Sequence, residues 1–434
     1  AEVARAADID ALIGVLPAVP DDVLVGHARR NGFSNWLMAR TEFALASELR
    51  SLGVDDFAST GEMRAFLIDR LQQTRDAQRR GQVVDFAAAR AGAGGTIVRI
   101  GGGSLGGKGR GLAFTFDLLS RGDVGRDLPR IRLFVPTTAV LGTDVFDAFV
   151  GAGDLEAFAL REPDDAAILA RFLATPLPDA VRADLAAFIE RADQPLAVRS
   201  SSLLEDSHHL PAAGVYPTHM LPNTASTPAE RLAALEAAIK HIYAATYFAA
   251  AKAYFAATPN RVEDEKMAVV IQQIVGDRHG DVVYPHFAGV AQSHNFYPVR
   301  EMKAEEGIAT VALGLGKTVV DGGRAVRFSP AHPRWLPQLS MTDDILANAQ
   351  RTFWALDLTR PPDLSRPDPE AALVELGLDI AERHDTLWPV ASVYVPDNDA
   401  VYDGLTRPGV RLVTFAPILK HDVVALCAAL QRLL

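Results

Sequence analysis

The first ninety residues place apolar side chains at helical intervals. Such a 3.6-residue period predicts amphipathic helices, here over residues 36–52 and 63–80. Ser59 and Glu62 have the spacing of a capping box at the start of the second of these helices. Residues 1–91 are therefore predicted to form a helical adaptor, and nothing in their pattern indicates catalysis.

The pattern changes in the next thirty residues. A short β-type run at 96–100 precedes a glycine-rich loop at 101–111, and an apolar helical pattern then continues to Gly122. The sequence predicts a strand, a glycine loop and a helix in that order. A further strand is predicted at 130–135 and a helix at 141–150.

The middle of the chain contains one long helical pattern. Thr227 and Glu230 form a second capping box, with Pro228 at the first helical position. Apolar residues then repeat with a helical period to about Ala257. A single helix with one buried face is predicted over residues 228–257.

Strands are predicted on both sides of that helix. Leu196–Val198 is a short apolar run, and residues 267–275 and 286–296 are predicted to be buried strands joined by a polar turn. Residues 358–370 contain four prolines, which predicts a linker or a surface loop.

Composition and charge narrow the class of protein. The 434 residues are 49% apolar and 22% charged, with a net charge of −11. A negative surface repels nucleic-acid phosphates and anionic lipids, so neither nucleic acid nor a membrane is expected as a partner. Cys427 is the only cysteine, which excludes an intramolecular disulfide and a cysteine-based zinc site. A cytoplasmic protein is predicted, because the sequence has no membrane-spanning run and no signal pattern.

The glycine loop carries the first candidate chemistry. Gly106, Gly107 and Gly109 surround Lys108 in a chain with only seven lysines. Glycines allow backbone N–H groups to turn toward an anion, a following helix adds its positive end, and a lysine adds a mobile charge. The loop is not a complete Walker A motif, because Gly109 stands where a hydroxyl would bind magnesium. A dinucleotide-binding turn and a flexible loop with an exposed lysine remain alternatives.

The second candidate is the strand end at Arg199. An arginine can hold phosphate oxygens with two parallel hydrogen bonds, and the hydroxyls of Ser200, Ser201 and Ser202 can add donors. Glu205–Asp206 could orient the arginine, bind magnesium or face solvent. Taken alone, the segment also fits a strand end followed by a solvated turn.

Seven segments occur in a fixed order: GGKG at 106–109, FVPTTAVLGTDVFDAF at 134–149, AVRSSSLLED at 197–206, AAGVY at 212–216, MAVVIQQIVG at 267–276, FAGVAQS at 287–293 and ALGLGKTVVDGG at 312–323. This combination resembles the nucleotide-binding domain of phosphoenolpyruvate synthase and pyruvate phosphate dikinase, which has an ATP-grasp fold. The resemblance extends over about residues 95–330, and its specificity lies in the order of the segments.

The resemblance implies roles for particular residues. Lys108 would contact the ATP phosphates from the glycine loop, and Arg199 would bind the transferred phosphoryl region, with Ser200 and Ser201 beside it. Lys317 would lie close to the nucleotide in a second lobe. The adenine pocket, at the hinge between the lobes, would be lined by Gln272, Gln273, Ile274 and Val275. ATP and Mg²⁺ are the implied cofactors.

The implied fold is an α+β, ATP-grasp-like fold with two lobes. The helical adaptor at 1–91 would precede a first lobe at 92–262 and a second lobe at 263–434. In this family ATP phosphorylates a histidine on a separate domain, which carries the group to pyruvate. The chain is predicted to be the ATP-binding part of a paired-acceptor phosphotransferase, inactive alone, with its acceptor domain or protein outside the chain.

The chain departs from the family pattern in several places. Ala250 and Phe255 replace arginines of a family helix, and Lys252 could substitute for them from a neighbouring turn. We find no Glu-x-Glu-Phe metal strand, no Gln-x-Arg strand and no Thr-x-His carrier segment before Leu434. The final helical pattern stops without a cap, which favours a fragment that continues past Leu434. A non-catalytic nucleotide-sensing or interaction module is the alternative function.

Overall fold

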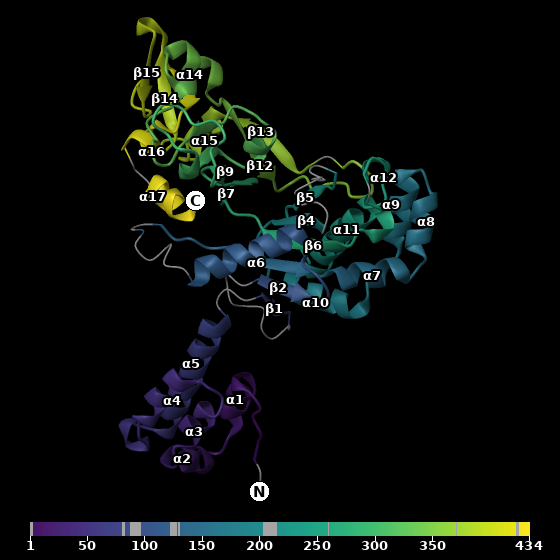
Figure 1. Cartoon of the computed structure of the whole chain (residues 1–434), viewed down its shortest axis with the longest axis vertical. Coiled ribbons are helices and arrows are strands. Elements are labelled where there is room, and N and C mark those ends of the chain that lie inside the picture. Colours follow the sequence, from purple (N-terminus) through teal and green to yellow (C-terminus); the bar gives the residue numbers. More distant parts are fainter. Residues whose placement is uncertain are drawn as a thin grey trace. The chain divides into compact units, whose positions relative to one another are not determined.

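The computed structural model describes residues 3–79, 83–86, 97–121, 128, 131–202, 215–258, 260–369, 371–421 and 425–434. The chain divides into two compact units, Ala1–Gln82 and Val83–Leu434. Figure 1 shows helices in the first unit and both helices and strands in the second. Mixed helices and several sheets agree with the predicted α+β class.

The first unit is built from short helices around its own apolar core. Leu16, Leu24 and Leu37 are almost completely buried in this core. Burial of one apolar face per helix is what stabilises helices of this length, because short isolated helices are marginal in water. The helices are α1 (Ile9–Val15), α2 (Asp21–Arg29), α3 (Gly32–Met38), α4 (Phe43–Arg50) and α5 (Thr60–Arg79).

The predicted helix over 36–52 is wrong, because the chain turns between α3 and α4. Thr41 has a φ of +63°, a left-handed conformation that interrupts helical hydrogen bonding. The capping box before α5 is present in part. Ser59 Oγ accepts the Glu62 N–H at 3.1 Å, but the Glu62 carboxylate accepts the N–H of Ala58 at 2.7 Å instead of that of Ser59.

The second unit begins with a mixed sheet. In the described residues its strand order is β1-β2-β3-β6-β4-β5, with β1, β2 and β3 parallel and the other neighbours antiparallel. The strands are β1 (Val83–Asp85), β2 (Ile97–Ile100), β3 (Thr138–Leu141), β4 (Leu196–Ser202), β5 (Thr218–Leu221) and β6 (Met267–Gln273). No strand forms at 131–135, where one was predicted. Instead β3 begins after Pro136, which lacks the N–H that a central strand needs.

Helices cover both faces of this sheet (Figure 1). Helix α6 packs on one face through Leu112, Phe116 and Leu119, and the larger core on the other face includes residues of α7 to α12. The helices are α6 (Gly106–Arg121), α7 (Thr143–Gly151), α8 (Leu155–Arg161), α9 (Asp165–Ala174), α10 (Asp179–Ile189), α11 (Pro228–Ala245) and α12 (Ala249–Ala256).

The predicted single helix over 228–257 is two helices. The capping box is confirmed: Thr227 Oγ1 accepts the Glu230 N–H at 3.2 Å, and the Glu230 carboxylate accepts the Thr227 N–H at 3.1 Å. Helix α11 ends at Ala245, however, because the chain bends to bury both Tyr247 and Phe248 in the core. This bend then allows α12 to start in a new direction.

The rest of the second unit contains smaller antiparallel sheets. Their strand orders are β13-β12-β8-β7, β11-β10-β9 and β15-β14-β16. The strands are β7 (Asp277–His279), β8 (Val282–Tyr284), β9 (Ala288–Gln292), β10 (Ile308–Ala312), β11 (Val326–Phe328), β12 (Thr352–Asp357), β13 (Leu373–Gly377), β14 (Ala391–Val395), β15 (Ala400–Asp403) and β16 (Val410–Val413). The helices are α13 (Lys317–Val320), α14 (Thr342–Asn348), α15 (Leu378–Arg383), α16 (Ala416–His421) and α17 (Leu426–Leu433).

Two predictions fail in this part of the chain. The polar turn was predicted at 276–281, but residues 277–279 there form β7, which pairs with β8 in a hairpin. The strand predicted within 286–296 exists as β9, but it is largely exposed instead of buried.

The described residues between 358 and 372 form no helix or strand, as the prolines predict. Among all described residues, no helix is both long enough and apolar enough to cross a membrane.

Candidate anion-binding site

Helix α6 begins inside the glycine loop, at Gly106, and not after it. Lys108 therefore lies in the first helical turn, where backbone N–H groups have no helical acceptor and the helix dipole is positive. The Lys108 side chain is half-buried and its Nζ is shielded from solvent. The sequence correctly predicted that the N-terminal end of a helix lies beside Lys108. It placed the lysine itself in the loop before that helix, whereas Lys108 belongs to the helix.

The start of α6 rests on the backbone of β4. A Cβ atom on Gly106 would overlap the carbonyl oxygen of Ser201, and Gly106 has a φ of +69°. Only glycine combines this close approach with a left-handed backbone at low cost. Gly106, which was predicted to allow the backbone to turn toward an anion, is therefore also required for packing.

The Ser201 hydroxyl connects the two candidate segments. Its Oγ accepts the N–H of Gly109 at 2.9 Å and donates to the carbonyl of Leu105 at 2.8 Å. Ser201 is completely buried. This contact joins residues 92 positions apart in the sequence and orients the first turn of α6 against the sheet.

The glycine turn before α6 is fixed from a second side by the start of α7. The N–H of Ser104 donates to Thr143 Oγ1 at 2.9 Å, and the N–H of Thr143 donates to the Ser104 carbonyl at 3.0 Å. The N–H of Asp144 also donates to the carbonyl of Gly102 at 3.2 Å. These bonds oppose the flexible-loop alternative. Sequence reasoning missed Thr143 and Ser104, whose only local signal is a threonine after a buried strand.

Strand β4 sorts its polar residues onto two faces. Arg199 and Ser201 are two residues apart, so they lie on the face that α6 covers, whereas Ser200 faces the opposite core and is buried. The Arg199 side chain is exposed. The structure therefore groups Gly106, Gly109, Ser201 and Arg199 on one face, and it separates Ser200 from them.

Gln272 lies on the same face as Arg199. In the antiparallel pairing, Val270 of β6 stands opposite Arg199, and Gln272 is two residues further along β6. The Gln272 amide donates to Thr138 Oγ1 at 3.1 Å. Gln273 faces the opposite side of the sheet, by alternation along the strand.

Ile274 and Val275 follow the end of β6. The N–H of Ile274 donates to the Pro195 carbonyl at 2.9 Å, and its side chain is buried in the apolar cluster of the later sheets. Ala197, the cross-strand partner of Gln272, contacts the same cluster. The Val275 side chain is 49% exposed. The predicted hinge residues therefore lie where the first sheet meets the rest of the second unit.

Lys317 has local partners of its own. It is the first residue of α13, its Nζ pairs with Asp321 at 2.6 Å, and the same atom lies 5.1 Å from the ring centre of Trp354. No contact that the structure describes joins Lys317 to Lys108 or Arg199.

Lys252 does not supply the charge that the replaced family arginines would have provided. Its Nζ donates to the carbonyls of Ala159 and Glu162, each at 2.6 Å, and so caps the end of α8. Burial lowers the pKa of Lys252. The substitution suggested by the sequence is therefore wrong, because this ammonium is already bound to backbone oxygens.

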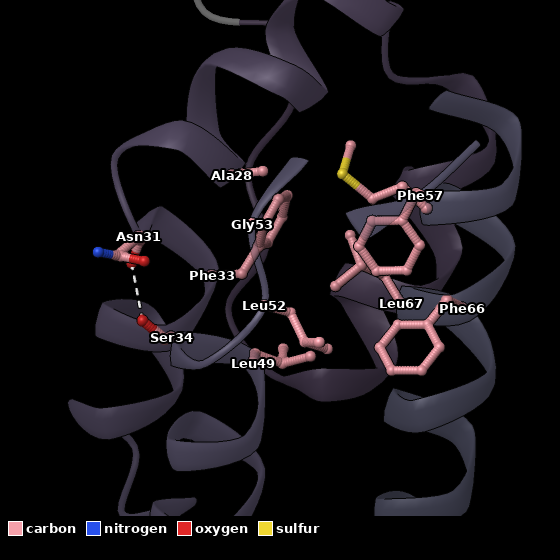
Figure 2. A pocket seen from close by; sticks show the side chains of 11 residues that line it. Ala28, Asn31, Phe33, Ser34, Leu49, Leu52, Gly53, Phe57, Phe66 and Leu67 are labelled. Carbon is pink, nitrogen blue, oxygen red and sulfur yellow. Dashed lines mark hydrogen bonds between the residues drawn. The ribbon is translucent and has the colours of Figure 1, made fainter. Parts of the chain in front are cut away.

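Three pockets lined by described residues lie away from these candidates. A small apolar pocket of about 30 Å³ lies in the first unit. Figure 2 shows that Phe33, Phe57 and Leu67 point toward one another in it. A larger apolar pocket of about 350 Å³ also belongs to the first unit. A third, of about 210 Å³, lies between the region of Leu221–Ala234 and Leu358–Leu364. None of these three is lined by a predicted site residue.

The described residues contain no group of three or more His, Cys, Asp or Glu side chains suited to a metal ion. Magnesium bound with a nucleotide usually needs only one or two protein carboxylates, because phosphate oxygens and water complete its shell. Asp144 places an exposed carboxylate against Gly102 and Gly103 of the glycine turn. Glu205–Asp206, the other predicted acids, lie outside the described residues.

A glycine turn, a helix start and an arginine-bearing strand on one sheet face define an anion-binding protein of the nucleotide-binding class. The family model of the pyruvate phosphate dikinase AMP/ATP-binding domain matches residues 103–339. The chain belongs to this family, which confirms the family predicted from the ordered segments. No curated protein sequence matches the chain significantly.

Proposed function

We propose that the second unit binds ATP in an ATP-grasp-like fold, with residues 92–262 and 263–434 as its two lobes. In this proposal the triphosphate lies at the first turn of α6, beside Lys108 and Arg199. The family match supports nucleotide binding. The observation that carries the proposal is the seating of Gly106 and Gly109 on Ser201, because it directs a helix start and an arginine strand to one face.

The proposed reaction is transfer of a phosphoryl group from ATP to a histidine of an acceptor outside this chain. Lys108 and Arg199 would hold the phosphate oxygens, which orients the group and neutralises its charge. Magnesium would enter with the nucleotide and supply further charge neutralisation. Asp144 would approach the magnesium ion, because its carboxylate lies against the glycine turn.

The first test is ATP affinity of the full chain. Lys108→Ala or Arg199→Ala should each weaken ATP binding by about 1.5–3 kcal/mol, the loss for a hydrogen bond to a charged group. Isothermal titration with Mg²⁺-ATP measures this. Lys420→Ala is a matched control, since Lys420 pairs with Asp403 near the C-terminus. Unchanged affinity in both site variants would contradict the proposal.

A second candidate function is a nucleotide-sensing module without phosphoryl transfer. The observation that favours it is that the Lys252 ammonium binds backbone carbonyls at the end of α8. Lys252 therefore does not take the place of the family arginines that Ala250 and Phe255 replace. Incubation of the native full-length protein with ATP distinguishes the two functions. Phosphohistidine would support transfer, formed with release of ADP if one phosphoryl group leaves ATP or of AMP if two leave together. ATP binding without any of these products would support sensing.

A further inference from the structure

A buried carboxylate lies at the end of the sheet on which α6 rests. Glu265 is only 2% exposed. Its Oε2 accepts the hydroxyl of Ser202 at 2.8 Å and the hydroxyl of Tyr216 at 3.1 Å, and its Oε1 accepts the N–H of Lys266 at 3.0 Å. A buried carboxylate is retained only when donors compensate its lost hydration, and these bonds help to fix the position of Glu265.

The donors belong to neighbouring strands of one sheet. Ser202 is the last residue of β4, Tyr216 lies two residues before β5, and Glu265 lies two residues before β6. Strand β4 is the central one of these three strands. A single side chain therefore ties three adjacent strands together at one end.

That end is also the support of the candidate site. Ser201 and Ser202 are consecutive and point to opposite faces of β4. Ser201 Oγ bonds to the first turn of α6, and Ser202 Oγ bonds to Glu265. Any displacement of Ser202 is therefore transmitted through one peptide unit to the residue that orients α6.

We propose that Glu265 is a positioning residue, which holds the end of β4 where Ser201 seats the first turn of α6. Through that turn it places the N–H groups and Lys108 that receive the nucleotide phosphates. The ligand in this inference rests on the proposed function, but the positioning itself does not. Glutamine at this position keeps an oxygen that can accept both hydroxyls, whereas alanine removes every acceptor.

Hydrogen exchange tests the positioning without any nucleotide. Glu265→Ala in the full chain should raise the exchange rate of the peptide 104–112 by about tenfold, because the Gly109 N–H loses its fixed acceptor. Glu265→Gln should restore most of the protection. Glu236→Ala is the matched control, because Glu236 of α11 is also a buried carboxylate but pairs with Arg182 of α10 at 2.8 Å. Equal exchange of this peptide in Glu265→Ala, Glu236→Ala and the wild type would overturn the inference.

Mg²⁺-ATP titration of the same proteins tests the consequence for binding. We expect the Kd to rise about tenfold in Glu265→Ala, to change less than about threefold in Glu265→Gln, and to stay near the wild-type value in Glu236→Ala. A wild-type protein that binds no ATP would defeat the proposed function, while the exchange result would still decide the inference. ATP binding that depends on Lys108 but not on Glu265 would defeat the inference alone. If Glu265→Ala does not fold, the pair Ser202→Ala and Tyr216→Phe provides the same comparison, with increased exchange expected in both.

Discussion

Two glycine–lysine segments of this chain look alike in sequence and differ in structure. Gly106 and Gly314 both have positive φ, and in both the missing Cβ allows close contact with a neighbouring strand, at Ser201 and at Trp354. The lysine that follows Gly314 pairs with Asp321, one helical turn later. The corresponding position after Lys108 holds Leu112. The glycine pattern thus predicts close backbone approach in both segments, and the two segments differ in the residue one helical turn after the lysine, which is acidic only after Lys317.

Alanine at Gly106 should have the largest effect on this comparison. Gly106→Ala is expected to lower the free energy of unfolding by about 3 kcal/mol or more, because it combines a left-handed backbone with overlap against Ser201. Gly314→Ala should also destabilise, since its Cβ would lie 2.6 Å from the Trp354 carbonyl oxygen.

Chemical denaturation measures both variants, with Gly111→Ala as the control. A Cβ on Gly111 meets nothing within 4 Å, and this residue lies inside α6. Alanine there should stabilise by about 0.5–1 kcal/mol, the usual gain over glycine in a helix. If Gly106→Ala behaves like Gly111→Ala, the seating of α6 on β4 is wrong.

Two histidine pairs extend the comparison to pH. His219 Nε2 lies 3.1 Å from His241 Nδ1 in the core of the first sheet, and burial lowers the pKa of His219 to about 3 and also lowers that of His241. In the later sheets, His384 stacks on His279, and burial lowers its pKa as well. The first pair is the more deeply buried, so it should have the stronger effect on stability.

A histidine whose pKa is lowered by folding binds its proton more readily in the unfolded chain. Stability is therefore full above the unfolded pKa of about 6.5 and falls as the pH drops toward the folded value. Protonation of His219 alone should lower the free energy of unfolding by about 1 kcal/mol as the pH falls from roughly 7.5 to 5.5. Denaturation across this range should show a flatter profile for His219→Gln than for His384→Gln. Identical profiles would contradict the burial of the first pair.

The smallest expected effect concerns Lys317. Because Asp321 already neutralises its charge, Lys317→Ala should weaken ATP binding by no more than about 1 kcal/mol, the value typical of an exposed ion pair. Lys108→Ala, measured in the same titration, should lose more. An equal loss in the two variants would show that a ligand displaces Asp321, and the contrast between the segments would disappear.

Much of the candidate site could be predicted because its signals are local or ordered along the chain. The strand at Ile97–Ile100, the glycine turn and the helix after it appear in that order, although α6 starts earlier than predicted. The family followed from the order of the segments. The contact that joins these segments, between Ser201 and Gly109, could not be predicted from spacing, because it spans 92 positions.

The sequence by itself determined features that are complete within one helical turn. The capping box of Thr227 and Glu230 is the clearest, since donor and acceptor are three residues apart. Tertiary structure decided which backbone oxygens bind Lys252 and which strands Glu265 ties together. It also decided which core each of Ser200 and Ser201 faces. The reason is physical: a side chain's conformational range is local, but its partners come from strands and helices that meet only when the apolar faces are buried.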